Sequence, residues 1–189
     1  MTEARRRQAL LVFADEASFA QWGSVGYTWA PRGQQPVVKT GGKRTGDKVW
    51  GLSEYFTGRV FYRGGTGRCN AAGDCAFLAA VLAATAQPLS VIQDGARSHT
   101  AQETQPFITQ HADRLTVHQL PSYSPDYKPI EHLWRNVKRD KTHNRYFPTF
   151  ESLIQAVEDR LGHVHAHPTA VKQVMGRYLE EQAACPLAA

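Results

Sequence analysis

Three acidic side chains stand at positions where an α/β fold often carries out its chemistry. Asp15 ends a short apolar run with Glu16 beside it, and Asp94 follows a second such run. Glu131 lies in the first turn of an expected helix, after a turn-rich segment that can bring it back toward the sheet. Because the ends of adjacent strands lie close together, the sequence predicts that these three acids form one cluster.

A cluster of three carboxylates is unfavourable without a cation, because like charges at short range raise one another's pKa. Mg²⁺ or Mn²⁺ removes this conflict, since hard divalent ions take oxygen ligands and keep several waters. Two such ions about 4 Å apart can activate an attacking oxygen and stabilise a leaving one in phosphoryl transfer. Taken singly, Asp94 before Gly95 suits a turn, and Glu131 suits the positive end of a helix. Only the three acids together favour a metal site.

Short apolar runs and the turn residues between them predict the strands that position these acids. The expected strands are 8–15, 48–55, 59–63, 89–93 and 115–120, with a further short strand at 36–39. The strands 48–55 and 59–63 would form a hairpin around a turn that ends in Gly58. Glycine and proline fill much of the stretch 23–46, which is otherwise expected to be a loop.

Apolar residues at helical spacing predict the helices. One is expected after Asn70 or Asp74, either of which can cap it. The others are expected over 100–110, after Pro129, and through the apolar positions of 150–161 and 171–179. The resulting order is three strands, helix, strand, helix, strand and helices. This order predicts an α/β fold with a mixed five-stranded sheet flanked by helices, as in the ribonuclease H-like fold, with extra C-terminal helices.

Length and composition favour a single globular domain. The chain has 189 residues, of which 42% are hydrophobic and 21% charged. No apolar run reaches the roughly 20 residues that span a bilayer, and the first residues do not have a signal-peptide pattern. The odd number of cysteines, three, favours a reducing cytoplasm. Membrane and secreted proteins are therefore disfavoured.

Positive charge is concentrated in two segments of a chain whose net charge is +5. Residues 32–48 contain five basic residues and one acid, and residues 128–145 contain six basic residues and two acids. Such segments suggest a polyanionic partner, nucleic acid first, although two solvated basic faces explain the charge equally well. Arg135 and Lys138 share a helix face with Glu131, which favours contact with DNA phosphates beside the acids.

Two further groups have an ordinary structural explanation that we prefer. Trp22, Tyr27 and Trp29 could stack on a base, but aromatic residues in such a loop more often pin the loop to the core. Three histidines alternate in a pattern that suggests zinc, but they follow a helix end, where cationic histidine favours the helix dipole. These histidines are His163, His165 and His167.

Three sequence blocks resemble the signature blocks of DDE transposases: FADEASF, VIQDGARSHTAQ and LPSYSPDYKPIEHLWRNVKR. They are most similar to the bacterial insertion-sequence branch of the mariner superfamily. The third block is the most specific, with its tyrosine-serine-proline turn, its Pro-Ile-Glu and a tryptophan three residues on. The resemblance implies a ribonuclease H-like domain that cuts transposon ends and joins the freed 3′-OH to target DNA, using two Mg²⁺ or Mn²⁺ ions.

The resemblance also implies roles for individual residues. Asp15, Asp94 and Glu131 would be the catalytic residues and the metal ligands. Glu16 and His99 would support them, and His99 stands where the second block of the family also has histidine. DNA contacts are expected from the two basic segments, through Arg135, Lys138, Arg139, Lys43 and Arg44.

The sequence departs from the family pattern at Gly95 and Lys128, where the blocks usually have asparagine. Members normally also carry an N-terminal helix-turn-helix region, which we expect to be absent here. We expect one catalytic domain over 1–189, with a core over 8–145 and C-terminal helices over 148–182. A split-gene half, a fragment and a remnant all fit this expectation. Recognition of DNA ends would then come from a separate helix-turn-helix protein or an upstream reading-frame product, and a homodimer also fits.

Two other functions fit the same residues. One is a DNA endonuclease of this fold that hydrolyses DNA without joining strands. The other is a catalytically idle DNA-binding or assembly remnant, against which the intact Asp15, Asp94 and Glu131 argue. A bacterial protein of any of these kinds is expected in the cytoplasm, associated with the nucleoid when it binds DNA.

Overall fold

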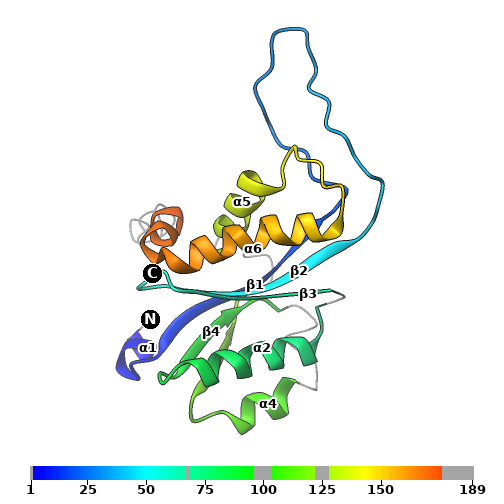
Figure 1. The fold of residues 1–189 in the computed structure, drawn as a ribbon. Coiled ribbons are helices and arrows are strands. Elements are labelled where there is room, and N and C mark those ends of the chain that lie inside the picture. The colour runs from blue at the N-terminus through cyan, green and yellow to red at the C-terminus, as the bar shows by residue number, and fades with distance from the viewer. Residues whose placement is uncertain (1, 67–68, 96–103, 122–127, 176–189) are drawn as a thin grey trace.

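A computed structural model describes residues 2–66, 69–95, 104–121 and 128–175 of the chain. Its centre is a five-stranded sheet with the strand order β3-β2-β1-β4-β5 (Figure 1). The strands are β1 (Leu10–Ala20), β2 (Gly46–Glu54), β3 (Val60–Thr66), β4 (Leu89–Gln93) and β5 (Leu115–Gln119). The helices are α1 (Thr2–Arg6), α2 (Ala71–Ala84), α4 (Thr104–Gln110), α5 (Ile130–Lys141) and α6 (Phe150–Ala166), and residues 168–175 are also helical.

The sheet is mixed, as the order of elements predicts. β1 pairs antiparallel with β2, and β2 pairs antiparallel with β3, whereas β4 pairs in parallel with both β1 and β5. At the predicted hairpin turn Gly58 adopts a φ of +77°, which a glycine accepts without a steric penalty. The buried carboxylate of Glu54 accepts hydrogen bonds from the backbone N–H groups of Phe56 and Thr57, and so closes the turn.

Helices cover both faces of the sheet, with α5 and α6 on one face and α2 and α4 on the other (Figure 1). Side chains alternate between the two faces along β1. Phe13 and Phe19 pack with α5 and α6, whereas Val12 and Ala14 pack with α2. The same alternation places Asp15 on the face that α5 covers.

The first strand is longer than the sequence predicts. β1 continues to Ala20, so Asp15 lies within the strand and not at its end. The reason is that β1 has a different partner on each edge. Its parallel pairing with β4 stops at Phe13, whereas its antiparallel pairing with β2 continues to Ala20 opposite Gly46.

The stretch between β1 and β2 contains no strand over residues 25–45, so the strand predicted at 36–39 is wrong. Figure 1 shows this stretch as a long loop that extends away from the sheet. A strand requires a neighbour that pairs with its backbone, and residues 36–39 have none in the part of the chain that the structure describes. Val37 is accordingly 90% exposed.

The other helices and strands agree with the sequence apart from their bounds. Asn70 caps α2 by accepting a hydrogen bond from the backbone N–H of Gly73. α1 is not predicted from the sequence. The predicted helix over 100–110 is described from Thr104, and the last predicted helix is described as far as Met175. No described helix combines the length and the apolar character that crossing a membrane requires.

Candidate active site

Two of the three predicted acids meet where β4 stops pairing with β1. The last parallel pair joins Phe13 to Ile92. Asp15 and Asp94 each lie two residues beyond that pair, Asp15 on the continuing β1 and Asp94 directly after β4. The shared register therefore brings the two aspartates level with each other, although only one of them ends a strand.

The side chain of Lys128 lies between these two aspartates. Its Nζ donates hydrogen bonds to Oδ1 of Asp15 at 2.7 Å and to Oδ2 of Asp94 at 2.8 Å. The Lys128 side chain is 8% exposed, against 14% for Asp15 and 42% for Asp94. Charge-assisted hydrogen bonds of this length are about twice as strong as neutral ones. One ammonium thus pairs with both of the carboxylates that the sequence predicts as metal ligands, and offsets one of their two negative charges.

Burial and the neighbouring opposite charge shift the pKa values of Asp15 and Lys128 in opposite directions. Burial raises the pKa of the Asp15 carboxyl above its usual value and outweighs the opposite effect of the Lys128 ammonium. The negative charges of Glu16 and Glu131 add to that rise. Burial would lower the pKa of Lys128, but its hydrogen bonds to Asp15 and Asp94 outweigh burial, and the pKa of Lys128 is raised. Lys128 is therefore a cation at neutral pH.

Glu131 faces the same region from the first turn of α5. It lines an open hollow of about 310 Å³ together with Asp15. The other residues of this hollow are Glu16, Ala17, Trp134, Arg135, Lys138 and His143. Within the described residues, no three acidic, histidine or cysteine side chains converge closely enough to hold a metal ion. The acids are therefore near one another, but the position between Asp15 and Asp94 is taken by the lysine.

The position of Glu131 depends on how α5 packs against the sheet. The buried stripe of α5 consists of Ile130, Leu133, Trp134 and Val137, as the helical spacing predicts. The ring of Trp134 lies directly over Gly51 of β2, where an added Cβ would be 2.6 Å from Cη2 of the ring. Trp134 also meets Phe19 edge to face, with 6.5 Å between the ring centroids. A residue without a side chain at position 51 thus lets α5 approach the sheet.

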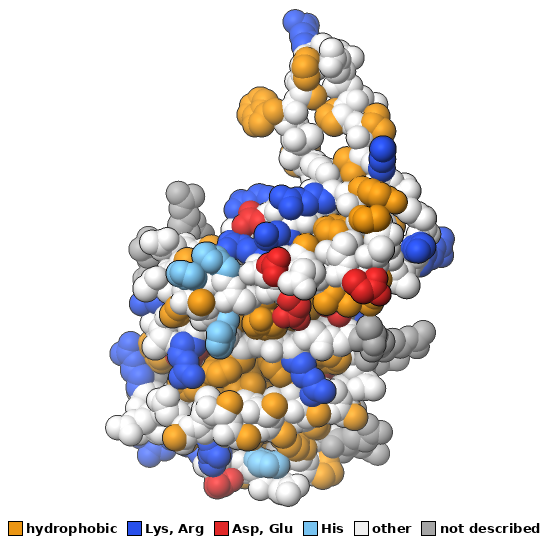
Figure 2. Space-filling model, in the orientation of Figure 1, with side chains coloured by type: hydrophobic (Ala, Val, Ile, Leu, Met, Phe, Trp, Pro, Cys, Tyr) orange, Lys and Arg blue, Asp and Glu red, His pale blue; other side chains and the backbone are white. Residues whose placement is uncertain are grey.

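The basic residues predicted on α5 lie beside the acids. Arg135 and Lys138 line the hollow that contains Asp15 and Glu131. Arg135 and Arg139 also line a second hollow of about 280 Å³, between α5 and the helical residues 168–175 that contribute Val174. Figure 2 shows Lys and Arg side chains gathered over this helical layer, below the extended loop. Lys43 and Arg44 belong to the extended loop itself.

The base of the extended loop is held by polar contacts and not by its aromatic residues. The side chain of Asn144 accepts a hydrogen bond from the backbone N–H of Gly26 and donates one to its carbonyl group. Tyr27 and Trp29 are fully exposed, and Trp22 is 48% exposed. The prediction that these rings pin the loop to the core is therefore wrong, because the loop leaves the sheet before they can reach it.

Two of the three alternating histidines, His163 and His165, lie in the last turn of α6, and His167 follows its end, so the helix extends further than the sequence predicts. The rings of His163 and His167 stack with their centroids 4.1 Å apart. His165 Nδ1 forms a hydrogen bond with the carbonyl oxygen of Val60, at 2.7 Å. The histidines therefore take part in helix-end and sheet contacts, and the described residues do not support a zinc site.

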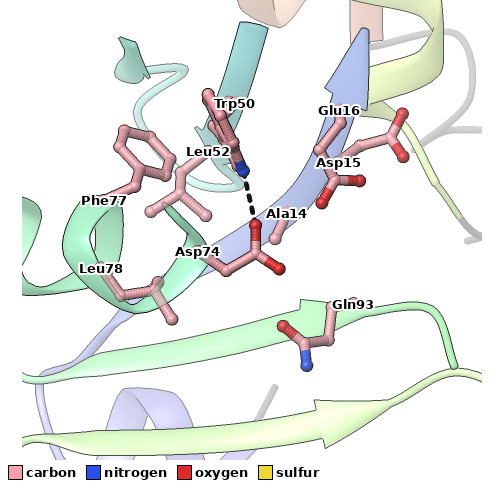
Figure 3. A pocket seen from close by; sticks show the side chains of 10 residues that line it. Ala14, Asp15, Glu16, Trp50, Leu52, Asp74, Phe77, Leu78 and Gln93 are labelled. Atoms are coloured by element: carbon pink, nitrogen blue, oxygen red, sulfur yellow. Dashed lines mark hydrogen bonds between the residues drawn. The ribbon is translucent and has the colours of Figure 1, made fainter. Parts of the chain in front are cut away.

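Asp74 and Gln93 lie near the predicted acids, although the sequence does not predict either as a site residue. Figure 3 shows a small hollow that Asp15 and Glu16 of β1 line together with Asp74 of α2 and Gln93 of β4. The Asp74 carboxylate accepts a hydrogen bond from Trp50 Nε1 and is 4% exposed. From the sequence, Asp74 is noted only as a possible helix cap. The other predicted supporting residue, His99, lies outside the described residues.

The chain is similar in sequence to a known protein family and to a transposase. The sequence profile described as "DDE superfamily endonuclease" matches residues 10–154. A curated relative is the transposable element Tc1 transposase of Caenorhabditis elegans, which is 30% identical over 151 residues, covering 71% of this chain and 53% of the relative. The chain thus spans about half the length of that relative.

Solved structures show a similar fold. The catalytic domain of Mos1 mariner transposase has a TM-score of 0.60 at 15% identity, over 94% of this chain and 83% of that one. A Mos1 mariner paired-end complex with Mn has a TM-score of 0.66 at 16% identity, over 94% of this chain and 56% of that one. At these identities the likeness concerns the fold, and it agrees with the ribonuclease H-like arrangement predicted from the order of strands and helices.

Proposed function

Because the chain belongs to the DDE superfamily endonucleases, we propose that it is a transposase catalytic domain that cleaves DNA at the ends of a transposable element and joins the freed 3′ end to target DNA. The observation that supports this most directly is the position of Asp15 and Asp94 at the point where β1 and β4 separate. Glu131 faces Asp15 across a hollow that basic side chains also line. That the element is a bacterial insertion sequence stays a prediction.

The donor atoms at this site suit a hard divalent cation. Asp15, Asp94 and Glu131 would supply carboxylate oxygens, which Mg²⁺ and Mn²⁺ prefer. Solved Mos1 mariner paired-end complexes contain Mn in one case and Mg in another. Bound there, such ions would activate the attacking oxygen and stabilise the leaving one. Lys128 must move for this to happen, because its ammonium lies between the two aspartates.

The chain's own residues would bind and orient the DNA. Arg135 and Lys138 line the same hollow as the acids, where they would bind phosphates and hold the scissile bond. Arg139, Lys43 and Arg44 would extend that contact along the strand. Two partners besides DNA stay predictions: a second copy of the chain, and a helix-turn-helix protein that recognises the transposon ends.

One observation favours a second candidate function. Lys128 forms ion pairs with both Asp15 and Asp94, and such an internal counter-charge would also suit a DNA-binding or assembly module without catalysis. In that case the acids would serve only the stability of the fold. The two functions differ in whether DNA is cut.

A labelled duplex separates these functions. We expect the chain to nick the duplex in the presence of Mg²⁺ or Mn²⁺ and to stop when the ion is removed by a chelator. Joined products, seen as longer labelled strands, would identify strand transfer, whereas nicks alone would identify an endonuclease. Retardation of the duplex without nicking under any metal condition would contradict catalysis and favour the binding module.

DNA affinity is expected to depend on salt and on α5. The expected Kd for unrelated duplexes is on the order of 10⁻⁴ to 10⁻⁶ M at physiological salt, because phosphate contacts dominate. Changing Arg135 and Lys138 to Glu should weaken binding to all sequences alike and flatten the slope of log K against log salt by about two. The measurement is a salt titration by fluorescence anisotropy.

The matched control makes the same change in net charge as the Arg135 and Lys138 double variant, but away from α5. Arg5 lies on α1 and its guanidinium stacks over Phe56. Arg59 directly precedes β3 and its guanidinium stacks over Phe61. Changing both to Glu should leave the salt slope nearly as in the unmodified chain. Equal effects of the two double variants would show that net charge and not the α5 face determines binding.

A further inference from the structure

The ammonium of Lys128 donates hydrogen bonds to two carboxylates in a largely buried position. It is within 2.8 Å of one oxygen from each aspartate, and its side chain is 8% exposed. A surface ion pair contributes little because solvent competes with it. This pair is different, since Lys128 and Asp15 are both largely removed from water. The lysine stands at a position where the resembling sequence blocks usually have asparagine.

A divalent ion and this ammonium exclude each other. Mg²⁺ binds carboxylate oxygens at about 2.0–2.1 Å, so an ion shared by Asp15 and Asp94 would occupy the place where the Lys128 nitrogen lies. The two cations would also repel each other in a partly buried setting, where water screens their charges weakly. Only one of them can therefore be held between the two aspartates at a time.

We propose that Lys128 is a resident counter-cation that competes with the divalent metal ion for Asp15 and Asp94, so that metal binds only when the lysine leaves. This inference rests on the proposed function in one respect, namely that these aspartates are metal ligands. It also explains how the pair of acids is tolerated when metal is absent: the lysine cancels the repulsion between them. DNA would assist the exchange, because its phosphates offer the ammonium another anion.

Lys128→Asn is expected to lower the melting temperature of the metal-free chain and to raise its affinity for Mn²⁺. Without metal, the variant should melt at a lower temperature, because the two charge-assisted hydrogen bonds from the Lys128 ammonium to Asp15 and Asp94 are lost. With Mn²⁺ titrated in, the variant should bind the ion at least about tenfold more tightly than the unmodified chain, since one charge-assisted competitor has been removed. A lysine that merely positioned the aspartates would show the opposite effect on affinity.

The experiment measures Mn²⁺ binding by the loss of the free-ion signal in electron paramagnetic resonance, without DNA and at one fixed pH. Lys138→Asn is the matched control. It removes one positive charge, as Lys128→Asn does, but from the hollow that Asp15 and Glu131 line. Its Mn²⁺ affinity should stay within about threefold of the unmodified chain, because the Lys138 ammonium lies over the Phe19 ring and not between the two aspartates. Lys128→Met is a second variant, which keeps the apolar stem if the asparagine prevents folding. Asp94→Asn tests the ligand role itself.

The outcomes separate this inference from the proposed function. Mn²⁺ binding that is lost in Asp94→Asn but not strengthened in either Lys128 variant overturns the competition alone. Binding that does not depend on Asp94 overturns the metal site and with it the competition. Tight binding by the Lys128 variants, together with an unmodified chain that never cuts DNA, supports the competition and contradicts the proposed catalysis. An equal gain in Lys138→Asn would reduce the effect to net charge and overturn the inference.

Discussion

Asp94→Asn is expected to lower the rate of DNA cleavage about a thousandfold or more, while the fold and the affinity for DNA remain. The substitution keeps the shape of the side chain but removes the charge that a divalent ion requires. Stabilisation by such an ion amounts to several kcal/mol in a transition state, and about 1.4 kcal/mol corresponds to a factor of ten in rate. Because the Asp94 side chain is 42% exposed, losing its ion pair with Lys128 should cost little stability.

Single-turnover nicking of a labelled duplex measures this effect, and thermal melting and retardation of the same duplex check the fold and the binding. Asp113→Asn is the matched control. It removes an exposed carboxylate from the turn before β5, and should cleave DNA at the unmodified rate. If Asp94→Asn retains cleavage within a few-fold, Asp94 is not a metal ligand and the proposed site is wrong.

The packing of Trp134 over Gly51 is expected to give the largest effect on stability. Trp134→Ala should lower the free energy of unfolding by about 3–5 kcal/mol, because it leaves a cavity between α5 and the sheet. Gly51→Ala should lower it by about 1–3 kcal/mol, because the added Cβ would lie 2.6 Å from Cη2 of the ring. In the double variant the new methyl group occupies part of the cavity, so the combined loss should be smaller than the sum.

Urea unfolding of the four proteins in this cycle measures the coupling between the two residues. Gly162→Ala provides the comparison, since among the described residues a Cβ there would meet the Tyr62 hydroxyl at an ordinary contact distance of 3.8 Å. It should be neutral or stabilising within α6 and should add independently to Trp134→Ala. Additive losses for the Gly51 and Trp134 pair would contradict the close packing of α5 on β2.

A single short segment joins the electrostatics of the site to this packing. Lys128, Glu131 and Trp134 are spaced three residues apart, at the start of α5 and just before it. Trp134 anchors the helix on the sheet, Glu131 faces the hollow, and Lys128 reaches the two aspartates. A loss of packing at Trp134 is therefore expected to displace both charged groups as well.

The sequence by itself determined those features that depend on near neighbours along the chain. Alternation and apolar runs identified the five strands of the sheet, and the spacing of Ile130, Leu133, Trp134 and Val137 identified the buried face of α5. It also predicted that Asp15 and Asp94 lie close together, and both do stand two residues beyond the last paired residues of β1 and β4.

Only the tertiary structure decided where strands end and which charges meet. β1 continues past Asp15 because β2 supplies a partner as far as Ala20, whereas no described strand pairs with residues 36–39. Lys128 is 113 residues from Asp15 and 34 from Asp94, so no local pattern relates them. Backbone pairing and ion pairing both depend on which distant groups the packing of helices on a sheet brings into contact.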